Sequence, residues 1–355
     1  MASRRFQKWA AKFPLTRRFV RSEGEAMFDL VAGFCHSQIL QAFVRLEIHK
    51  KLLETEMTCA VLADECEVPP DRMAVLMGAA VSLGLVKQGK SGRYGLTTRG
   101  AALAGVPGLA GMIDHHEVLY LDLADPVAFF KGEVDTELAE FWPYVLGAGG
   151  LTDARATQTY SQLMEDCQVL VAEDTIDAVG LSDVRQFMDV GGGTGAFLSA
   201  VAKEYPHLEL MLFDLPRVSG LAQERMERLG IANQVQIMSG SFHDDPLPRG
   251  ADMISLVRVL YDHDDAAVLA LLKSVREALP DGGRILISEP MTGGATPERA
   301  GNAYFALYCM AMRTGRARST GEVAALLEQA GFTDIKVPRT RRPYITSVVT
   351  AVRQS

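Results

Sequence analysis

The sequence predicts an α/β fold in its C-terminal half, in which a mainly parallel, open sheet alternates with helices. From about residue 183 onward, short apolar, β-prone segments alternate with segments of helical periodicity. One of these segments, 186–190, runs directly into a glycine-rich turn and then into a helix. A helical unit with a winged-helix pattern is expected in front of the sheet.

The glycine-rich turn, 191–195, follows the first of these strands. Without Cβ atoms, Gly191 and Gly193 let the backbone turn sharply and let a ligand approach backbone N–H groups. Asp214 follows the next strand, 23 residues after Gly191, where a carboxylate can bind both ribose hydroxyls of a nucleoside. A nicotinamide-binding sheet would share these features, so by themselves they do not identify the ligand.

Two further features narrow the choice of ligand. Asp189 precedes the glycines, which is common where the ligand is cationic and unusual for dinucleotide binders. Residues 278–289 form a helix end, a glycine turn and a strand that closes on Glu289. Together these features resemble the class I S-adenosylmethionine (SAM) methyltransferases, which implies SAM as cofactor and S-adenosylhomocysteine as product.

The composition indicates a globular protein of two domains. The chain has 355 residues and an ordinary hydrophobic content of 48%, and we expect no apolar run to approach the ~20 residues of a membrane helix. Five scattered cysteines without metal-ligand spacing predict reduced thiols, a cytoplasmic protein and no metal site. The net charge of −8 argues against nucleic acid as the main partner.

The N-terminal arm, residues 1–22, departs from this average. Residues 1–21 contain seven basic residues and no acidic one, with aromatic side chains between them. The pattern is not that of a secretory signal. It favours an amphipathic segment that lies on an anionic membrane surface, and the alternatives are a solvated arm or a strap that wraps a dimer.

Residues 23–105 are predicted to form a helical, winged-helix dimerisation domain. A wide apolar stripe over residues 26–48 indicates helices buried on more than one side, which a subunit interface would explain. Residues 57–100 have the winged-helix pattern of short helices followed by a hairpin. Its second helix, 71–83, has Arg72 as its single basic residue, so we do not expect it to bind DNA.

Residues 106–182 are predicted to connect the two parts and to line a substrate pocket. Prolines and glycines break the segment into short helices, and aromatic side chains are dense in it. The alternative is a simple packed connector. The candidate pocket residues are His115, His116, Tyr120 and Trp142.

Residues 183–355 are predicted to form a Rossmann-like SAM-binding domain. The last two strands lie too close together for a crossover helix, so they should form an antiparallel hairpin at the sheet edge. The expected strands are 186–190, 209–214, 234–238, 252–258, 284–289, 334–338 and 345–352. Ligands of such sheets bind at the carboxyl ends of the strands, which makes the side chains there candidates.

Besides Gly191 and Gly193, the candidates for cofactor binding are Asp214, Leu215, Ser241, Phe242 and Arg258. The ring of Phe242 can stack on adenine, and Ser241 can hydrogen-bond to its edge. Methyl transfer to an oxygen also requires a base within hydrogen-bond reach of the proton. The loop after the fourth strand supplies Tyr261 and His263 as candidates, whereas Asp264 is expected to cap the following helix.

Over residues 25–355 the chain resembles the dimeric small-molecule O-methyltransferases, and most strongly the carotenoid O-methyltransferases of phototrophic bacteria. The segments that carry the closer resemblance are 115–120, 123–129, 141–145, 258–263 and 343–349. The resemblance implies a homodimer that methylates the 1-hydroxyl of an acyclic hydroxycarotenoid, such as hydroxyneurosporene or demethylspheroidene, in spheroidene-type carotenoid biosynthesis. Such a substrate lies in the bilayer, so the arm would bring a cytoplasmic enzyme to the inner or photosynthetic membrane.

The resemblance also implies a catalytic histidine where this chain has Tyr261, a tryptophan where it has His263, and two acids beside the base. Glu289 matches one acid, but the other matches Ala317. The candidate catalytic residues are therefore Tyr261, His263 and Glu289, with a pocket histidine such as His116 as a further acceptor. A tertiary alcohol is weakly acidic, so loss of its proton should be concerted with methyl transfer.

Two other functions fit the same pattern. One is C-methylation of a bacteriochlorophyll precursor, because related pigment enzymes also have a tyrosine at the base position. The other is a SAM-binding winged-helix regulator without catalysis. The retained Glu289 and the sparsely basic second helix of the winged-helix segment argue against this regulator.

Overall fold

The computed structural model describes residues 2–141 and 154–354. The chain divides into two compact units, Met1–Asp114 and His115–Ser355, so most of the predicted connector belongs to the same unit as the sheet. Trp142, one of the candidate pocket residues, lies outside the described residues. Each unit has its own hydrophobic core.

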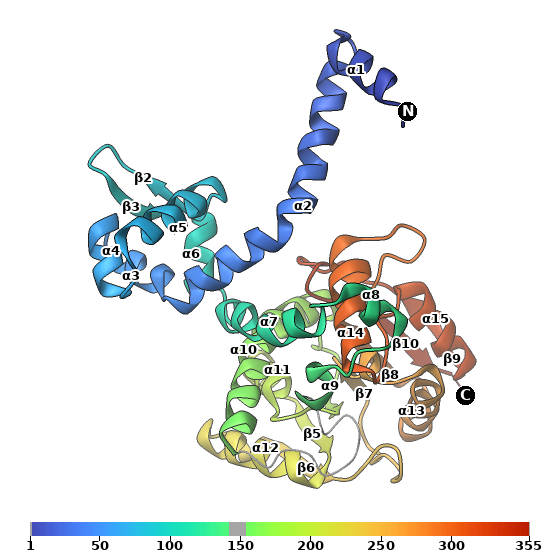
Figure 1. Cartoon of the computed structure of the whole chain (residues 1–355). Coiled ribbons are helices and arrows are strands. Elements are labelled where there is room, and N and C mark those ends of the chain that lie inside the picture. The colour runs from blue at the N-terminus through green and yellow to red at the C-terminus, as the bar shows by residue number, and fades with distance from the viewer. Residues whose placement is uncertain (1, 142–153, 355) are drawn as a thin grey trace. The chain divides into compact units, whose positions relative to one another are not determined.

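The first unit is mainly helical (Figure 1). Its helices are α1 (Arg4–Lys12), α2 (Arg17–Arg45), α3 (Ile48–Glu54), α4 (Cys59–Glu65), α5 (Pro70–Ser82) and α6 (Thr98–Gly105), followed by α7 (Leu109–Asp122), which continues into the second unit. Its strands β1 (Met57–Thr58), β2 (Val86–Gln88) and β3 (Arg93–Leu96) form an antiparallel sheet in the order β1-β3-β2. The predicted hairpin is confirmed, whereas β1 was not predicted.

Local sequence determines where these helices begin and end. Helix α5 begins at Pro70, whose missing N–H costs nothing in the first turn. Gly84 follows the end of α5 with a φ of 69°, a conformation that favours glycine. The hydroxyl of Thr97 caps α6 by accepting a hydrogen bond from the N–H of Gly100 at 3.1 Å.

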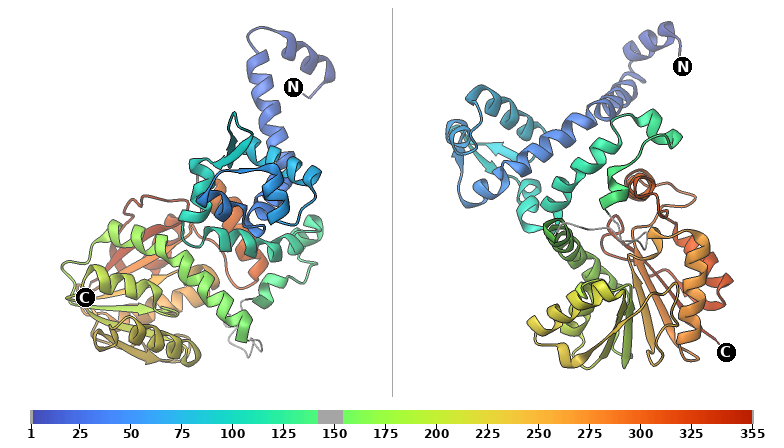
Figure 2. Two further views of the ribbon diagram at one scale, coloured as in Figure 1. Left: turned by 90° about the vertical axis from the view of Figure 1, so that its left-hand side faces the viewer. Right: turned by 60° about the horizontal axis from the view of Figure 1, so that its bottom comes forward.

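Much of α2 is exposed, and its N-terminal half extends away from α3 to α6 (Figures 1 and 2). Six large apolar side chains of α2 have exposed fractions of 61–72%: Phe19, Met27, Phe28, Leu30, Val31 and Phe34. By length and composition alone, α2 is the one helix in the described part of the chain that could cross a membrane, which corrects the expectation of no such segment. An apolar surface of this extent indicates an interaction site.

The second unit contains a sheet covered by helices on both faces (Figure 2). Its strands are β4 (Gln186–Val190), β5 (Glu209–Asp214), β6 (Val235–Ser239), β7 (Met253–Val257), β8 (Arg284–Glu289), β9 (Phe332–Lys336) and β10 (Ser347–Arg353). In the described residues the sheet has seven strands in the order β6-β5-β4-β7-β8-β10-β9. Strands β4 to β8 run parallel, and β10 is antiparallel to β8 and β9, which confirms the predicted reversed hairpin.

Two cores lie on the two faces of this sheet. One face is covered by α10 (Ala154–Val179), α11 (Ala196–Glu204) and α12 (Pro216–Arg228), the other by α13 (Asp265–Ala278) and α15 (Thr320–Gln329). The remaining helical elements are α8 (Pro126–Lys131), α9 (Glu137–Phe141), η1 (Ala232–Gln234), η2 (Leu260–Asp262), the π-helix η3 (Arg299–Phe305) and α14 (Ala306–Met312). Successive strand residues alternate between the cores, as Phe187 and Met188 do.

The exposed side of α2 generates a prediction about the oligomer. Phe34→Glu places a charge in the apolar surface, so we expect the parent chain to be a dimer at micromolar concentration and this variant to be a monomer in light scattering. Asp29→Asn is the matched control, because Asp29 is exposed and lies on another side of the same helix. A monomeric parent chain would contradict the prediction.

Candidate functional site

The carboxyl ends of four neighbouring parallel strands, β5, β4, β7 and β8, meet at one edge of the sheet. Ligands of open α/β sheets bind at this edge. The glycine-rich turn follows β4, and Asp214 and Glu289 are the last residues of β5 and β8. The structure therefore brings the predicted strand-end residues together.

Asp214 joins the glycine-rich turn to the start of α12. Its carboxylate accepts hydrogen bonds from the N–H groups of Gly193 at 2.7 Å and of Leu215 at 2.6 Å. Burial raises the pKa of Asp214, while these two N–H groups act in the opposite direction. Gly193 has a φ of 59°, and a Cβ atom there would meet nothing within 4 Å, so the turn borders open space.

A second carboxylate lies directly beneath the turn. Asp189 is 1% exposed, and its Oδ1 accepts a hydrogen bond from the hydroxyl of Ser255 at 2.6 Å. Its Oδ2 has no hydrogen-bond partner among the described residues. Burial raises the pKa of Asp189 to about 7. A buried, unpaired carboxylate oxygen beside a turn that borders open space fits a polar or cationic ligand.

The predicted adenine-binding residues lie after β6. The ring of Phe242 contacts two histidine rings, with centroid distances of 4.5 Å to His243 and 5.3 Å to His263. The ring of His263 therefore lies against Phe242. Burial lowers the pKa of His263 to about 4, and the nearby His243 and Arg318 act in the same direction. The hydroxyl of Ser241 accepts a hydrogen bond from the N–H of His243 at 3.2 Å.

Two buried polar side chains, Glu289 and Arg318, hold the loop that follows β7. Glu289 is 0% exposed, and its Oε2 accepts hydrogen bonds from the N–H groups of Leu260 at 3.0 Å and of Tyr261 at 3.3 Å. Arg318, also 0% exposed, donates to the carbonyl oxygens of Leu260 and His263, each at 2.8 Å. Arg318 has an ion pair with Asp265 at 2.7 Å as well. Sequence analysis found Glu289 but missed Arg318, which no local pattern distinguishes.

The same loop presents three polar side chains near one another. Arg258 has a φ of 59°, a strained conformation for a non-glycine residue, and its Nε lies 3.4 Å from the hydroxyl of Tyr261. Burial raises the pKa of Tyr261, so this hydroxyl stays protonated near neutral pH. Asp262, to which sequence analysis gave no role, has a buried Oδ1 without a partner among the described residues. Burial raises the pKa of Asp262 well above its usual range.

Two of the predicted pocket residues on α7 pair with tyrosines from the segment of η3 and α14. The Nε2 atom of His115 lies 2.9 Å from the hydroxyl of Tyr308, and that of His116 lies 2.6 Å from the hydroxyl of Tyr304. Tyr120 contacts the ring of His116 at a centroid distance of 6.3 Å. Neither tyrosine was identified from the sequence, although a π-helix such as η3 often marks a functional position.

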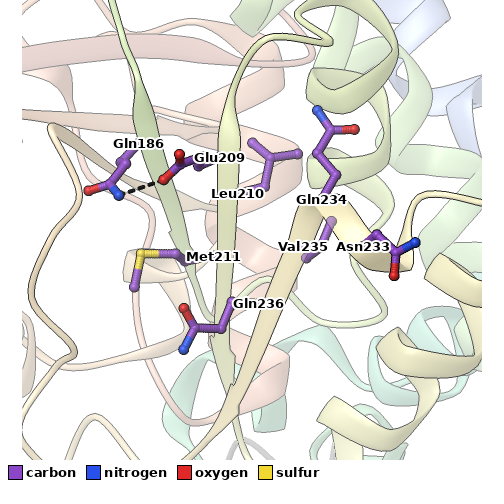
Figure 3. Close-up of a pocket in the computed structure, with 8 residues that line it drawn as sticks. All are labelled: Gln186, Glu209, Leu210, Met211, Asn233, Gln234, Val235 and Gln236. Carbon is purple, nitrogen blue, oxygen red and sulfur yellow. Dashed lines mark hydrogen bonds between the residues drawn. The ribbon is translucent and has the colours of Figure 1, made fainter.

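A separate hollow of about 300 Å³ lies at the amino ends of the strands, opposite the carboxyl ends (Figure 3). Gln186, Glu209 and Gln234 are among the residues that line it, and the amide of Gln186 donates to Glu209 at 2.7 Å. It lies where β4 and β5 begin, away from the edge at which ligands of parallel sheets bind. Among residues 2–141 and 154–354, no group of His, Cys, Asp or Glu side chains is arranged to hold a metal ion.

Comparison with known proteins gives two family matches. Residues 120–333 match the O-methyltransferase domain, and residues 28–105 match the O-methyltransferase dimerisation domain. The second match begins within α2 and includes most of its exposed apolar residues. It confirms the prediction of a homodimer.

Several relatives and solved structures are similar over most of the chain. Demethylspheroidene O-methyltransferase of Cereibacter sphaeroides is 54% identical over 353 residues, which cover 99% of this chain and 93% of the relative. The enzyme of that name from Rhodobacter capsulatus is 52% identical, covering 99% and 88%. Human N-acetylserotonin methyltransferase, solved in complex with SAM, shares the fold with a TM-score of 0.76 and 24% identity, covering 94% of this chain and 98% of that structure.

Burial of Asp189 generates a prediction about stability and pH. The pKa of Asp189 is about 7 in the folded protein and about 4 in the unfolded chain, so between these values the folded state holds the proton more tightly. This group therefore lowers the free energy of unfolding as pH rises through that window, by at most about 1.4 kcal/mol per pH unit. In urea unfolding at pH 5 and pH 8, Asp189→Asn should lose less stability than the parent.

Asp244→Asn is the control for this comparison, because Asp244 is exposed and the variant should keep the parent's pH dependence. An equal loss of stability in the parent and in Asp189→Asn would contradict the prediction.

Proposed function

The chain belongs to the O-methyltransferase family, and we propose that it transfers the methyl group of SAM to the tertiary hydroxyl of an acyclic hydroxycarotenoid. The observation that carries the substrate class is the 54% identity to demethylspheroidene O-methyltransferase over nearly the whole chain. The described site residues and the name of this relative both support O-methylation.

The carboxyl edge of the sheet fits the proposed cofactor. SAM supplies an electrophilic methyl group on a sulfonium sulfur when it is bound. Asp214, already oriented by two N–H groups, would accept the ribose hydroxyls, and Gly191 and Gly193 would let the ligand approach the turn. Phe242 and Ser241 would hold the adenine, and the unpaired Oδ2 of Asp189 suits the cationic end of the ligand.

The loop after β7 would position the substrate. In this proposal Glu289 positions the backbone of the loop, and Tyr261 presents a protonated hydroxyl beside Arg258 that can orient the substrate. His263 would border the adenine, because its ring lies against Phe242. Much of the rate acceleration would come from holding the hydroxyl and the methyl group together in a dry site.

The product of the reaction tests this proposal. After incubation of the full-length protein with SAM and a hydroxycarotenoid, mass spectrometry and NMR should show one added methyl group as a methoxy group. A methyl group on carbon of a bacteriochlorophyll precursor, or binding of SAM without any product, would instead support one of the alternative functions.

The variant Asp214→Ala tests the assignment of the cofactor. Loss of this carboxylate leaves buried partners unpaired, so the affinity for S-adenosylhomocysteine in calorimetry should weaken by about 1–3 kcal/mol. Binding of NAD in preference to S-adenosylhomocysteine would contradict the assignment.

We further propose that the enzyme is cytoplasmic and that its N-terminal arm brings it to an anionic membrane surface. Along α1 and the residue that follows it, the aromatic rings of Phe6, Trp9 and Phe13 lie in a row, with centroid distances of 5.8 Å and 4.9 Å. The basic residues of α1 lie around the rest of the helix, and Trp9 is 52% exposed. An aromatic face flanked by basic side chains suits the interface of an anionic bilayer.

Paired charge variants test the role of the arm. Each basic residue near anionic lipid contributes roughly 1 kcal/mol, so Lys8→Ala/Lys12→Ala should reduce co-sedimentation with phosphatidylglycerol vesicles, more so at low salt. Lys87→Ala/Lys90→Ala removes the same charge from the exposed β2–β3 hairpin and should have little effect. If both pairs sediment like the parent, and only the dimer weakens when residues 1–21 are deleted, the arm is a dimer strap.

A further inference from the structure

Two histidine–tyrosine pairs lie side by side between α7 and the segment of η3 and α14, and their surroundings differ. Tyr308, the partner of His115, belongs to a buried apolar cluster with Leu119, Phe129 and Leu138. Tyr304, the partner of His116, lies close enough to Arg258, Cys167 and Tyr120 to interact with them electrostatically. The second pair therefore faces the polar loop of the candidate site, whereas the first is packed in a core.

The backbone of η3 explains how Tyr304 reaches this position. The segment Arg299–Phe305 is a π-helix, which is wider than an α-helix and rare, and which is frequently found at functional sites. It carries Tyr304 against α7, so the hydroxyl lies 2.6 Å from Nε2 of His116 while the rings meet edge to face at 5.4 Å. An irregular helix that positions one hydroxyl against one imidazole is a second sign of function.

We propose that Tyr304 and His116 form a two-step relay that accepts the proton of the substrate hydroxyl; this inference rests on the proposed O-methylation. The hydroxyl oxygen of the substrate forms a bond to the methyl carbon, and the carbon–sulfur bond breaks with its electron pair left on sulfur. The hydroxyl proton passes to the oxygen of Tyr304, whose own proton passes to Nε2 of His116. The positive charge that sulfur loses appears on His116, so the net charge of the site is unchanged.

The protonation states that this relay requires agree with the surroundings of the pair. Burial lowers the pKa of His116, so its imidazole is neutral at neutral pH and can accept a proton. Burial raises the pKa of Tyr304, which keeps its hydroxyl protonated and able to pass a proton on. The titratable and charged groups near Tyr304, besides His116, include Tyr120 on α7, Tyr308 on α14, Cys167 on α10 and Arg258 after β7.

Neither of the candidate bases in the loop after β7, Tyr261 and His263, is an equivalent acceptor. The hydroxyl of Tyr261 lies 3.4 Å from Nε of Arg258, and its raised pKa makes it a hydrogen-bond donor. The ring of His263 contacts Phe242 and His243, which line the part of the site assigned to adenine. Of the two imidazoles that have a tyrosine hydroxyl beside them, His116 is the one whose tyrosine faces this loop.

Single-turnover rates test the relay, with the neighbouring pair as a matched control. Tyr304→Phe and His116→Gln should each slow methyl transfer by at least ~10²-fold, the range for loss of general-base assistance. Tyr308→Phe removes the same hydroxyl from the packed pair and should stay within a few-fold of the parent. Affinity for S-adenosylhomocysteine should be unchanged in all three variants, which excludes misfolding as the cause.

The pH profile separates a relay from a packing role. The parent's rate should rise with pH up to the pKa of His116, below about 6.5, and then level off, and Tyr304→Phe and His116→Gln should lose this rise. The relay is overturned if Tyr304→Phe keeps the rise or stays within a few-fold of the parent. It is also overturned if Tyr261→Phe or His263→Gln alone abolishes the rise.

Histidine NMR of the parent chain tests the contact without substrate or turnover. With the resonance of His116 assigned from His116→Gln, its Nε2 should be unprotonated at neutral pH, and Tyr304→Phe, but not Tyr308→Phe, should move its pKa upward. A protonated Nε2, or no shift in Tyr304→Phe, overturns the relay. Failure of the proposed function is separate, because it would show as a parent enzyme that forms no methylated hydroxycarotenoid.

Discussion

The position of the loop after β7 depends on two buried polar side chains, Glu289 and Arg318. Glu289 accepts hydrogen bonds from the N–H groups of this loop, and Arg318 donates to its carbonyl oxygens. The hydrogen bonds to the loop compensate the burial of both side chains, and Arg318 also has its ion pair with Asp265, so removing either side chain would leave buried backbone groups of the loop without a partner. Gly315 adds a steric condition, because a Cβ atom there would collide with the backbone of Tyr261 and His263. These contacts determine where the side chains of Tyr261 and Asp262 lie.

The sheet determines where Glu289 and the loop after β7 lie. Its parallel strands place Asp214 and Glu289 at one edge although they are far apart in the sequence. Next to β8, the reversed strand β10 pairs Ser347 with Glu289, and a chain of buried hydroxyls joins Thr175, Ser288 and Thr346 at distances of 2.6 Å and 2.8 Å. These hydrogen bonds tie α10, β8 and the start of β10 together beneath the site, so the carboxylate of Glu289 projects from rigid surroundings.

The edge of the sheet also carries polar atoms that the rest of the fold does not satisfy. Within the described residues, one carboxylate oxygen each of Asp189, Asp262 and Glu289 is buried without a hydrogen-bond partner. Such atoms are rare in folded proteins because each costs stability. Their concentration at the strand ends indicates that stability is given up there for binding and chemistry, whereas the two cores on the faces of the sheet are well packed.

Local sequence determined the strands, the glycine-rich turn and the helix caps, including Asp264, which accepts a hydrogen bond from the N–H of Ala267 at 2.8 Å as predicted. Because ligands bind where parallel strands end, it also indicated Asp214 and Glu289. Only the tertiary structure decided that Arg318 reaches Leu260, 58 residues away, and that Tyr304 reaches His116, 188 residues away. Periodicity and turn residues determine backbone conformation over a few residues, whereas these contacts depend on how whole helices pack, which the side-chain volumes of many distant residues determine together.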